Sequence, residues 1–256
     1  MNKKRMIQAM CALGLIYCML FTTLYAKTQP AKEKPGAAIF VMATQNSVTA
    51  CPKSYHYQSE VISLDMKIPQ LQGLTDRTFQ RQFNQNLLKE AKARKKNAIS
   101  EALQYNKEMI RDGLKPLKFE YLESYTAIPS PYPYYTLEFF KYQYSGGAHG
   151  LGELRYITID LIKNKIISLK DLFKPTVDYK ALINAGINEQ ISRRIQQGEV
   201  FFVGDGGFVG IKDEQNFYIN QDGLIVIVFN VYEIAPYAAG VIEIPLDMTK
   251  LLPYMK

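Results

Sequence analysis

The spacing of apolar residues predicts one long helix in the first half of the chain. From Thr75 to Gly113, apolar side chains recur every three or four residues, which lines them up on one face of a helix. Thr75 or Asp76 can accept a hydrogen bond from a free amide of the first turn, and Gly113 followed by Pro116 is typical of a helix end. The apolar face consists of Phe79, Phe83, Leu87, Ala91, Ala98, Ala102, Leu103, Met109 and Ile110. We therefore expect this helix to be buried along one side.

A second, shorter helix and several strands are predicted in the same way. The helix is expected from about Val177 to Gln197, with Gly198 at its end. Alternation of apolar and polar residues with a period of two predicts a strand from Ser59 to Ile68. Further strands are expected at residues 118–127, 134–144, 154–161, 216–220, 224–229 and 241–246. This order predicts an α+β fold in which antiparallel sheets pack against one long and one shorter helix.

Two segments between these elements have the composition of loops. Residues 128–133 include three prolines, which cannot donate to a strand ladder, so an exposed loop or sheet edge is expected. Residues 204–210 have the glycine spacing of a dinucleotide-binding loop. However, residues 212–220 predict a turn and a strand, and no helix N-terminus follows to hold a pyrophosphate. We expect a mobile loop in which an exposed Phe208 is a candidate for contact with a partner.

The N-terminal residues have the charge pattern of an export signal. Lys3, Lys4 and Arg5 precede an uncharged stretch at residues 6–26, and residues 24–26 form a plausible cleavage site. The uncharged stretch also approaches the roughly 20 residues that span a bilayer. A retained membrane anchor is therefore the alternative to a cleaved signal. In both cases the remainder is expected to be extracytoplasmic: secreted, periplasmic or associated with the cell envelope.

Composition narrows the possible ligands. The formal charge of +7 falls to +4 without the three basic residues of the signal, which suits anionic cell-wall polymers but does not call for a nucleic-acid partner. Outside the signal, the cysteine Cys51 and the histidines His56 and His149 have no metal-ligand spacing. A single cysteine also excludes an internal disulfide. We expect no metal, no cofactor and a fold that depends on its apolar core.

The segment at residues 144–150 is the most typical of a functional site. Gly146 and Gly147 permit positive φ angles and can turn backbone amides toward an anion or a carbonyl group. His149 is a candidate proton carrier, with Ser145 as nucleophile, provided that the two side chains are hydrogen-bonded and an acid orients the ring. The alternative is a glycine-rich connection between two strands, in which His149 bonds to neighbouring backbone.

A second candidate segment is the chain corner at residues 230–240. Tyr232 and Glu233 offer a phenol and a carboxylate, and a glutamate on the next strand makes a two-carboxylate hydrolase conceivable. The alternative is structural: the hydroxyls of Tyr232 and Tyr237 stabilise the corner by hydrogen bonds. Gly240 is expected to adopt a backbone conformation that a Cβ atom disfavours.

These two segments, with the apolar runs at residues 224–229 and 241–246, resemble the extracytoplasmic domain shared by RsiV-type anti-sigma factors and PdaC-type peptidoglycan deacetylases. This domain of unknown function is similar to about residues 59–252. The resemblance implies a PdaC-like α+β subdomain at residues 59–145 and an RsiV-like one at residues 146–256. A signal peptide at residues 1–26 and a linker at residues 27–58 would precede them.

The resemblance implies a non-catalytic binding module. RsiV-type domains recognise lysozyme, so lysozyme or a peptidoglycan fragment is the expected partner. Anti-sigma activity is not expected, because about five residues before the apolar stretch are too few to hold a sigma factor. PdaC-type catalytic residues belong to a separate domain and are not carried over. The candidate binding residues are Gly146, Gly147, His149, Phe208, Tyr232 and Tyr237.

Two further points concern the kind of function and the charge of the partner. The alternative to a binding module is a hydrolase or deacetylase-type enzyme that acts on cell-wall glycan or peptide through His149, Ser145 or Glu233. A basic partner such as lysozyme would also be repelled by a net positive chain unless acids cluster locally. Candidates for such a cluster, on adjoining predicted strands, are Glu120, Glu123 and Glu138.

Overall fold

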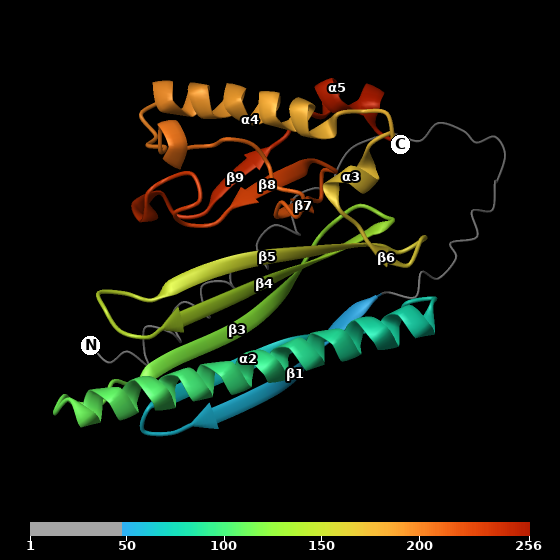
Figure 1. Ribbon diagram of the computed structural model, residues 1–256. Coiled ribbons are helices and arrows are strands. Elements are labelled where there is room, and N and C mark those ends of the chain that lie inside the picture. The colour runs from blue at the N-terminus through green and yellow to red at the C-terminus, as the bar shows by residue number, and fades with distance from the viewer. Residues whose placement is uncertain (1–47) are drawn as a thin grey trace, which may run out of the picture. The chain divides into compact units, whose positions relative to one another are not determined.

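The computed structural model describes residues 48–256 (Figure 1). The expected export signal, the alternative membrane anchor and most of the expected linker lie outside these residues. Among the residues that are described, no helix combines the length and apolarity needed to cross a membrane.

The larger sheet has six strands in the spatial order β1-β2-β3-β4-β5-β6. All neighbouring strands are antiparallel except β2 and β3, which run parallel because a helix returns the chain to the same end of the sheet. Alternate side chains of β2, including Ile62, Leu64 and Met66, are buried, as the period of two predicts. The strands are β1 (Thr49–Gln58), β2 (Ile62–Gln72), β3 (Phe119–Ile128), β4 (Tyr134–Tyr144), β5 (Leu151–Asp160) and β6 (Lys165–Ile166).

The long helix α2 (Arg77–Arg111) packs along this sheet (Figure 1). The Asp76 carboxylate caps it by accepting hydrogen bonds from the amides of the first turn at 2.8 and 2.9 Å. Leu103 and Ile110, expected on the apolar face, are exposed. The buried stripe is about one residue wide per turn, and these two side chains lie on its flank. The buried residues of α2 are Phe83, Leu87, Ala91, Ala98, Ala102 and Asn106.

The second core lies between a smaller sheet and the helix α4 (Tyr179–Gln196). Ile183 and Ile187 of α4 are fully buried in it, as the predicted apolar face requires. The antiparallel strands, in the order β7-β8-β9, are β7 (Phe217–Ile219), β8 (Ile225–Phe229) and β9 (Ile242–Pro245). The short helices are α3 (Leu169–Leu172) and α5 (Met248–Leu251). The predicted α+β class is therefore confirmed.

Strand β1 differs from the expectation drawn from the sequence. A linker is predicted for residues 27–58, but residues 49–58 pair with β2 over ten positions. Most β1 side chains are exposed on both faces, so no apolar alternation marks the strand. Its backbone ladder holds it in place instead. The larger sheet also runs through the expected subdomain boundary after residue 145, because β5 pairs with β4.

Two asparagine side chains join the smaller sheet to the edge of β5. One edge of β5 pairs with β4. Its other edge pairs with a strand, β6, only at residues 159 and 160. The Leu154 amide donates to the Asn230 side-chain oxygen at 2.7 Å, and the Tyr156 amide donates to that of Asn216 at 2.8 Å. Both asparagine NH₂ groups donate to the Leu154 carbonyl, at 2.8 and 3.0 Å. These side chains thus satisfy backbone amide and carbonyl groups at a strand edge, where another strand would otherwise pair.

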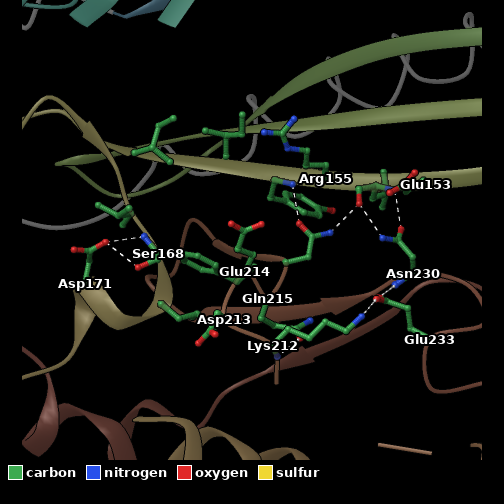
Figure 2. A pocket seen from close by; sticks show the side chains of 18 residues that line it. Glu153, Arg155, Ser168, Asp171, Lys212, Asp213, Glu214, Gln215, Asn230 and Glu233 are labelled. Atoms are coloured by element: carbon green, nitrogen blue, oxygen red, sulfur yellow. Dashed lines mark hydrogen bonds and ion pairs between the residues drawn. The ribbon is translucent and has the colours of Figure 1, made fainter. Parts of the chain in front are cut away.

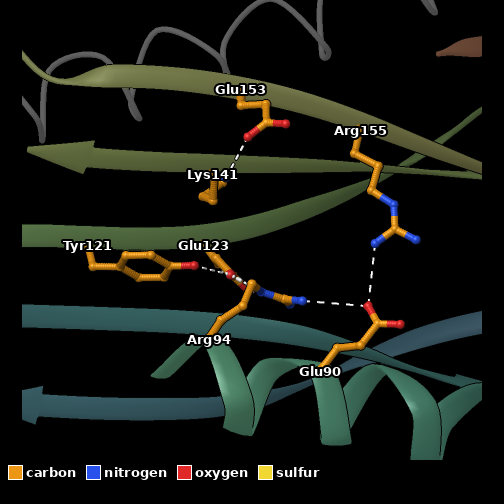
Figure 3. A network of polar contacts seen from close by, with 7 residues as sticks. All are labelled: Glu90, Arg94, Tyr121, Glu123, Lys141, Glu153 and Arg155. Atoms are coloured by element: carbon orange, nitrogen blue, oxygen red, sulfur yellow. Dashed lines mark hydrogen bonds and ion pairs between the residues drawn. The ribbon is translucent and has the colours of Figure 1, made fainter. Parts of the chain in front are cut away.

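A partly buried ion pair, in which the carboxylate is the buried partner, joins α2 to the centre of the larger sheet (Figure 3). Arg94 donates two hydrogen bonds, at 2.6 and 3.0 Å, to the carboxylate of Glu123, whose side chain is 8% exposed. The Tyr121 hydroxyl donates to the same carboxylate at 2.5 Å. Burial raises the pKa of Tyr121, and the hydrogen bond to Glu123 raises it further. Nearer the surface, Glu90 pairs with Arg155.

We predict that Arg94→Ala lowers the free energy of unfolding by about 3 kcal/mol, because the Glu123 carboxylate then stays buried without its cation. Lys92→Ala, which removes an exposed cation from the same helix, is expected to change stability by less than about 0.5 kcal/mol. Urea melts of the two variants measure the difference. Equal losses would show that the ion pair does not hold the helix.

Candidate binding site

The glycine-rich segment connects β4 to β5 and presents His149. Gly146 and Gly147 have φ angles of 112° and 87°, as their glycine character predicts. The ring of Tyr142 lies across Gly150: a Cβ atom added there would come within 2.4 Å of the ring. The Tyr144 hydroxyl donates to the Gly147 carbonyl at 3.2 Å. Glycine therefore serves here to turn the chain and to admit an aromatic ring.

His149 stacks on a residue nearly ninety positions away. Its ring and that of Tyr237 are 4.2 Å apart between centroids, with an interplanar angle of 22°. The ring of Tyr232 follows at 5.6 Å from Tyr237. All three side chains are exposed, and we call His149, Tyr232 and Tyr237 the aromatic corner. The structure thus brings His149 together with the two tyrosines of the chain corner, although the two segments are far apart in the sequence.

The proposed Ser145 and His149 pair does not form. The His149 Nδ1 atom lies 3.0 Å from the Gly150 carbonyl, as in the non-catalytic alternative. Among the hydrogen bonds and ion pairs of residues 48–256, none joins Ser145 to His149 and none gives His149 a carboxylate partner. The geometry needed for nucleophilic catalysis is therefore not assembled at this histidine.

The chain corner is held by Glu233 and not by tyrosine hydroxyls. The Glu233 carboxylate accepts a hydrogen bond from the Asn230 amide at 2.7 Å and pairs with Lys212 at 3.2 Å. The hydrogen bonds of the described residues include none from the hydroxyls of Tyr232 or Tyr237. Tyr232 has a φ angle of 68°, which is rare and strained for a tyrosine. The corner is thus a strained turn that exposes its two aromatic residues.

A cavity of about 320 Å³ opens beside the aromatic corner. The aromatic residues that line it are Tyr142, Tyr144, His149 and Tyr237, and its one acidic lining residue is Glu120. We call it the aromatic cavity. No lysine or arginine is among its described lining residues.

A larger cavity of about 580 Å³ lies along the free edge of β5 (Figure 2). Glu233 belongs to this cavity and does not line the aromatic cavity, so Glu233 and His149 do not share a site. Most of the carboxylates that line this cavity are neutralised by nearby cations. Asp171 pairs with Lys165 at 2.6 Å, and this contact lowers the pKa of the Asp171 carboxyl to about 2. Asn216 and Asn230 occupy its strand edge, which leaves little free hydrogen-bonding backbone for a ligand.

Phe208 faces inward, in contrast to its expected exposure. Its ring packs edge-on against Phe229, with centroids 5.6 Å apart and an interplanar angle of 80°. The exposed apolar residues of this loop are Val203 and Val209. The loop adjoins the chain corner through a hydrogen bond from the Phe202 amide to the Ile234 carbonyl.

Among residues 48–256, no group of three or more His, Cys, Asp or Glu side chains is arranged to hold a metal ion.

Comparisons with known proteins match both parts of the chain. The family described as "Deacetylase PdaC" matches residues 55–152, and the family described as "Protein of unknown function (DUF3298)" matches residues 170–248. The chain is thus similar to a PdaC part followed by a DUF3298 part. The anti-sigma-V factor RsiV of Bacillus subtilis (strain 168) is 26% identical over 247 residues, covering 94% of this chain and 82% of RsiV. These matches support a relationship between the chain and RsiV/PdaC-like DUF3298 domains.

Two solved structures share the fold. A DUF3298 family member from Bacteroides fragilis NCTC 9343 superposes with a TM-score of 0.64 at 17% identity, covering 82% of this chain and 93% of that chain. A DUF3298 family protein from Pseudomonas aeruginosa PAO1 gives a TM-score of 0.53 at 16% identity, covering 82% and 94%. At these identities the likeness concerns the fold alone.

We predict effects of different size at the two positions of the corner that have positive φ angles. Gly240 has a φ angle of 71°, as expected, so Gly240→Val should lower the free energy of unfolding by about 1–3 kcal/mol through backbone strain. Tyr232→Gly relieves such strain and should change stability by less than about 1 kcal/mol. Denaturant melts test both. A large loss in Tyr232→Gly would mean that the tyrosine ring stabilises the fold.

Proposed function

We propose that this chain is a non-catalytic binding module of the cell envelope that recognises lysozyme or a peptidoglycan fragment through the aromatic corner. The observation that carries the proposal is the exposed stack of His149, Tyr237 and Tyr232. Large aromatic side chains are enriched at recognition surfaces, where they bury much area and lose little conformational entropy. Similarity to RsiV over most of the chain supports a role in binding a partner.

Backbone strain in the corner supports recognition over a purely structural role. A tyrosine with positive φ costs free energy that glycine would avoid, and such outliers concentrate at functional sites. The ring of Tyr232 is 53% exposed, so its burial in the fold does not offset that cost. A contact with a partner is the function that such a residue fits.

Location outside the cytoplasm belongs to the same proposal. It is supported by the charge pattern of the first 26 residues and by similarity to RsiV. The proposal holds for a cleaved signal and for a retained anchor, since both would deliver the domain to the outer face of the membrane.

We predict that calorimetric titration of the parent protein with hen egg-white lysozyme gives a dissociation constant in the micromolar range. Tyr237→Ala should weaken binding at least about tenfold, the loss expected for an aromatic anchor. Tyr254→Ala, which removes a tyrosine of similar exposure elsewhere on the surface, is the matched control. Thermal melts of both variants should stay close to that of the parent. No heat with lysozyme or with soluble peptidoglycan fragments would refute the proposed function.

The enzyme alternative has its own test. A hydrolase or deacetylase that uses His149 would turn over purified peptidoglycan, and this activity would disappear in His149→Ala while the melting temperature stayed unchanged. We expect no turnover by the parent protein, because His149 is stacked on Tyr237 and bonded to backbone.

A further inference from the structure

We infer that the aromatic cavity binds a positively charged side chain, lysine or arginine, of a protein partner, with Glu120 as its counter-charge. The inference rests on the proposed function, because it specifies the chemistry by which the same surface recognises a partner. Among the candidate partners it selects a basic protein over a neutral glycan.

Two of the aromatic residues that line the cavity, Tyr144 and His149, are held by contacts within the fold. Tyr142 lies across Gly150, and Tyr144 is fixed by its hydrogen bond to the Gly147 carbonyl. His149 is held between the Gly150 carbonyl and the ring of Tyr237. Ring faces attract organic cations, and a preorganised set of rings loses little entropy when the cation enters.

Glu120 supplies a negative charge that nothing in the described chain neutralises. It lies opposite Tyr144 in the register of β3 and β4, and its side chain forms no ion pair or hydrogen bond with any other residue of the range 48–256. The other two glutamates of the expected acidic cluster are engaged. Glu123 is buried against Arg94, and Glu138 accepts a hydrogen bond from the Tyr156 hydroxyl at 2.7 Å. The local acidity of this surface therefore depends on Glu120.

Charge and size together favour a cationic side chain. The cavity contains one carboxylate and no lining lysine or arginine, so it attracts a cation and repels an anion. Its volume of about 320 Å³ is at the lower end of ligand cavities and suits one side chain better than a glycan strand. The chain as a whole is positive and would repel a basic partner at long range. A free carboxylate at the point of contact supplies the local negative charge that attracts such a partner.

The first experiment uses small probes and does not depend on lysozyme. The isotope-labelled protein is titrated with arginine amide, lysine amide, choline and N-acetylglucosamine while its amide NMR signals are followed. We expect the two amino-acid amides to shift the signals of Gly146, Gly147 and Gly150 in the parent but not in Glu120→Gln. Shifts caused only by N-acetylglucosamine or only by choline would overturn the inference. Unchanged signals elsewhere in the Glu120→Gln spectrum establish that the variant is folded.

The second experiment measures lysozyme affinity by calorimetry. Glu120→Gln should weaken binding roughly 5- to 30-fold, the range expected for losing a counter-charge beside aromatic rings. Glu214→Gln removes an equal charge from an exposed glutamate outside the aromatic cavity and should change the affinity by less than about twofold. Equal effects in the two variants would overturn the inference while leaving the proposed function intact. If lysozyme does not bind the parent, that part of the proposed function fails, and the probe titration still decides what the cavity binds.

Discussion

The contact between the edge of β5 and the side chains of Asn216 and Asn230 is the constraint on which the candidate site depends. An uncovered strand edge has amides and carbonyls that need partners, and two primary amides supply both donors and acceptors in little space. Asn230 is also the first residue of the chain corner. The hydrogen bonds that complete the sheet edge therefore hold the start of the segment that carries Tyr237, which stacks on His149. The contacts that join the two layers therefore lie next to the candidate site.

The polar groups of the larger sheet have two different roles on its two sides. Toward α2, Glu123 is matched by Arg94 and Tyr121, so its charge is neutralised within the fold. A buried pair of this kind gives little net stability but costs much when it is broken, and it specifies where the helix lies. On the other side, Glu120 is left without a partner beside aromatic rings. A carboxylate that the fold does not neutralise is available to a ligand.

Elements marked by their own periodicity could be predicted from the sequence, while features that depend on distant partners could not. The stripe from Phe83 to Ala102 and its Asp76 cap defined α2, since both signals are local. Strand β1 has no such signal, because pairing with β2 rather than burial holds it. Local composition indicates His149 and Tyr237 separately, but their stacking joins segments nearly ninety residues apart, which no local pattern reveals. Glu233 was grouped with them by proximity in sequence, although its carboxylate turns back to cap Asn230 and to meet Lys212.

The position of Tyr142 over Gly150 couples a residue of β4 to the glycine that precedes β5. A methyl group at position 150 would collide with the outer atoms of a side chain that can rotate away, and not with backbone. An alanine there would thus be accommodated by moving the ring, and the fold would survive. What would be lost is a wall of the aromatic cavity. Residues 142 and 150 should accordingly change together in evolution. Such paired changes would reflect selection for ligand binding, which measurements of folding stability would not detect.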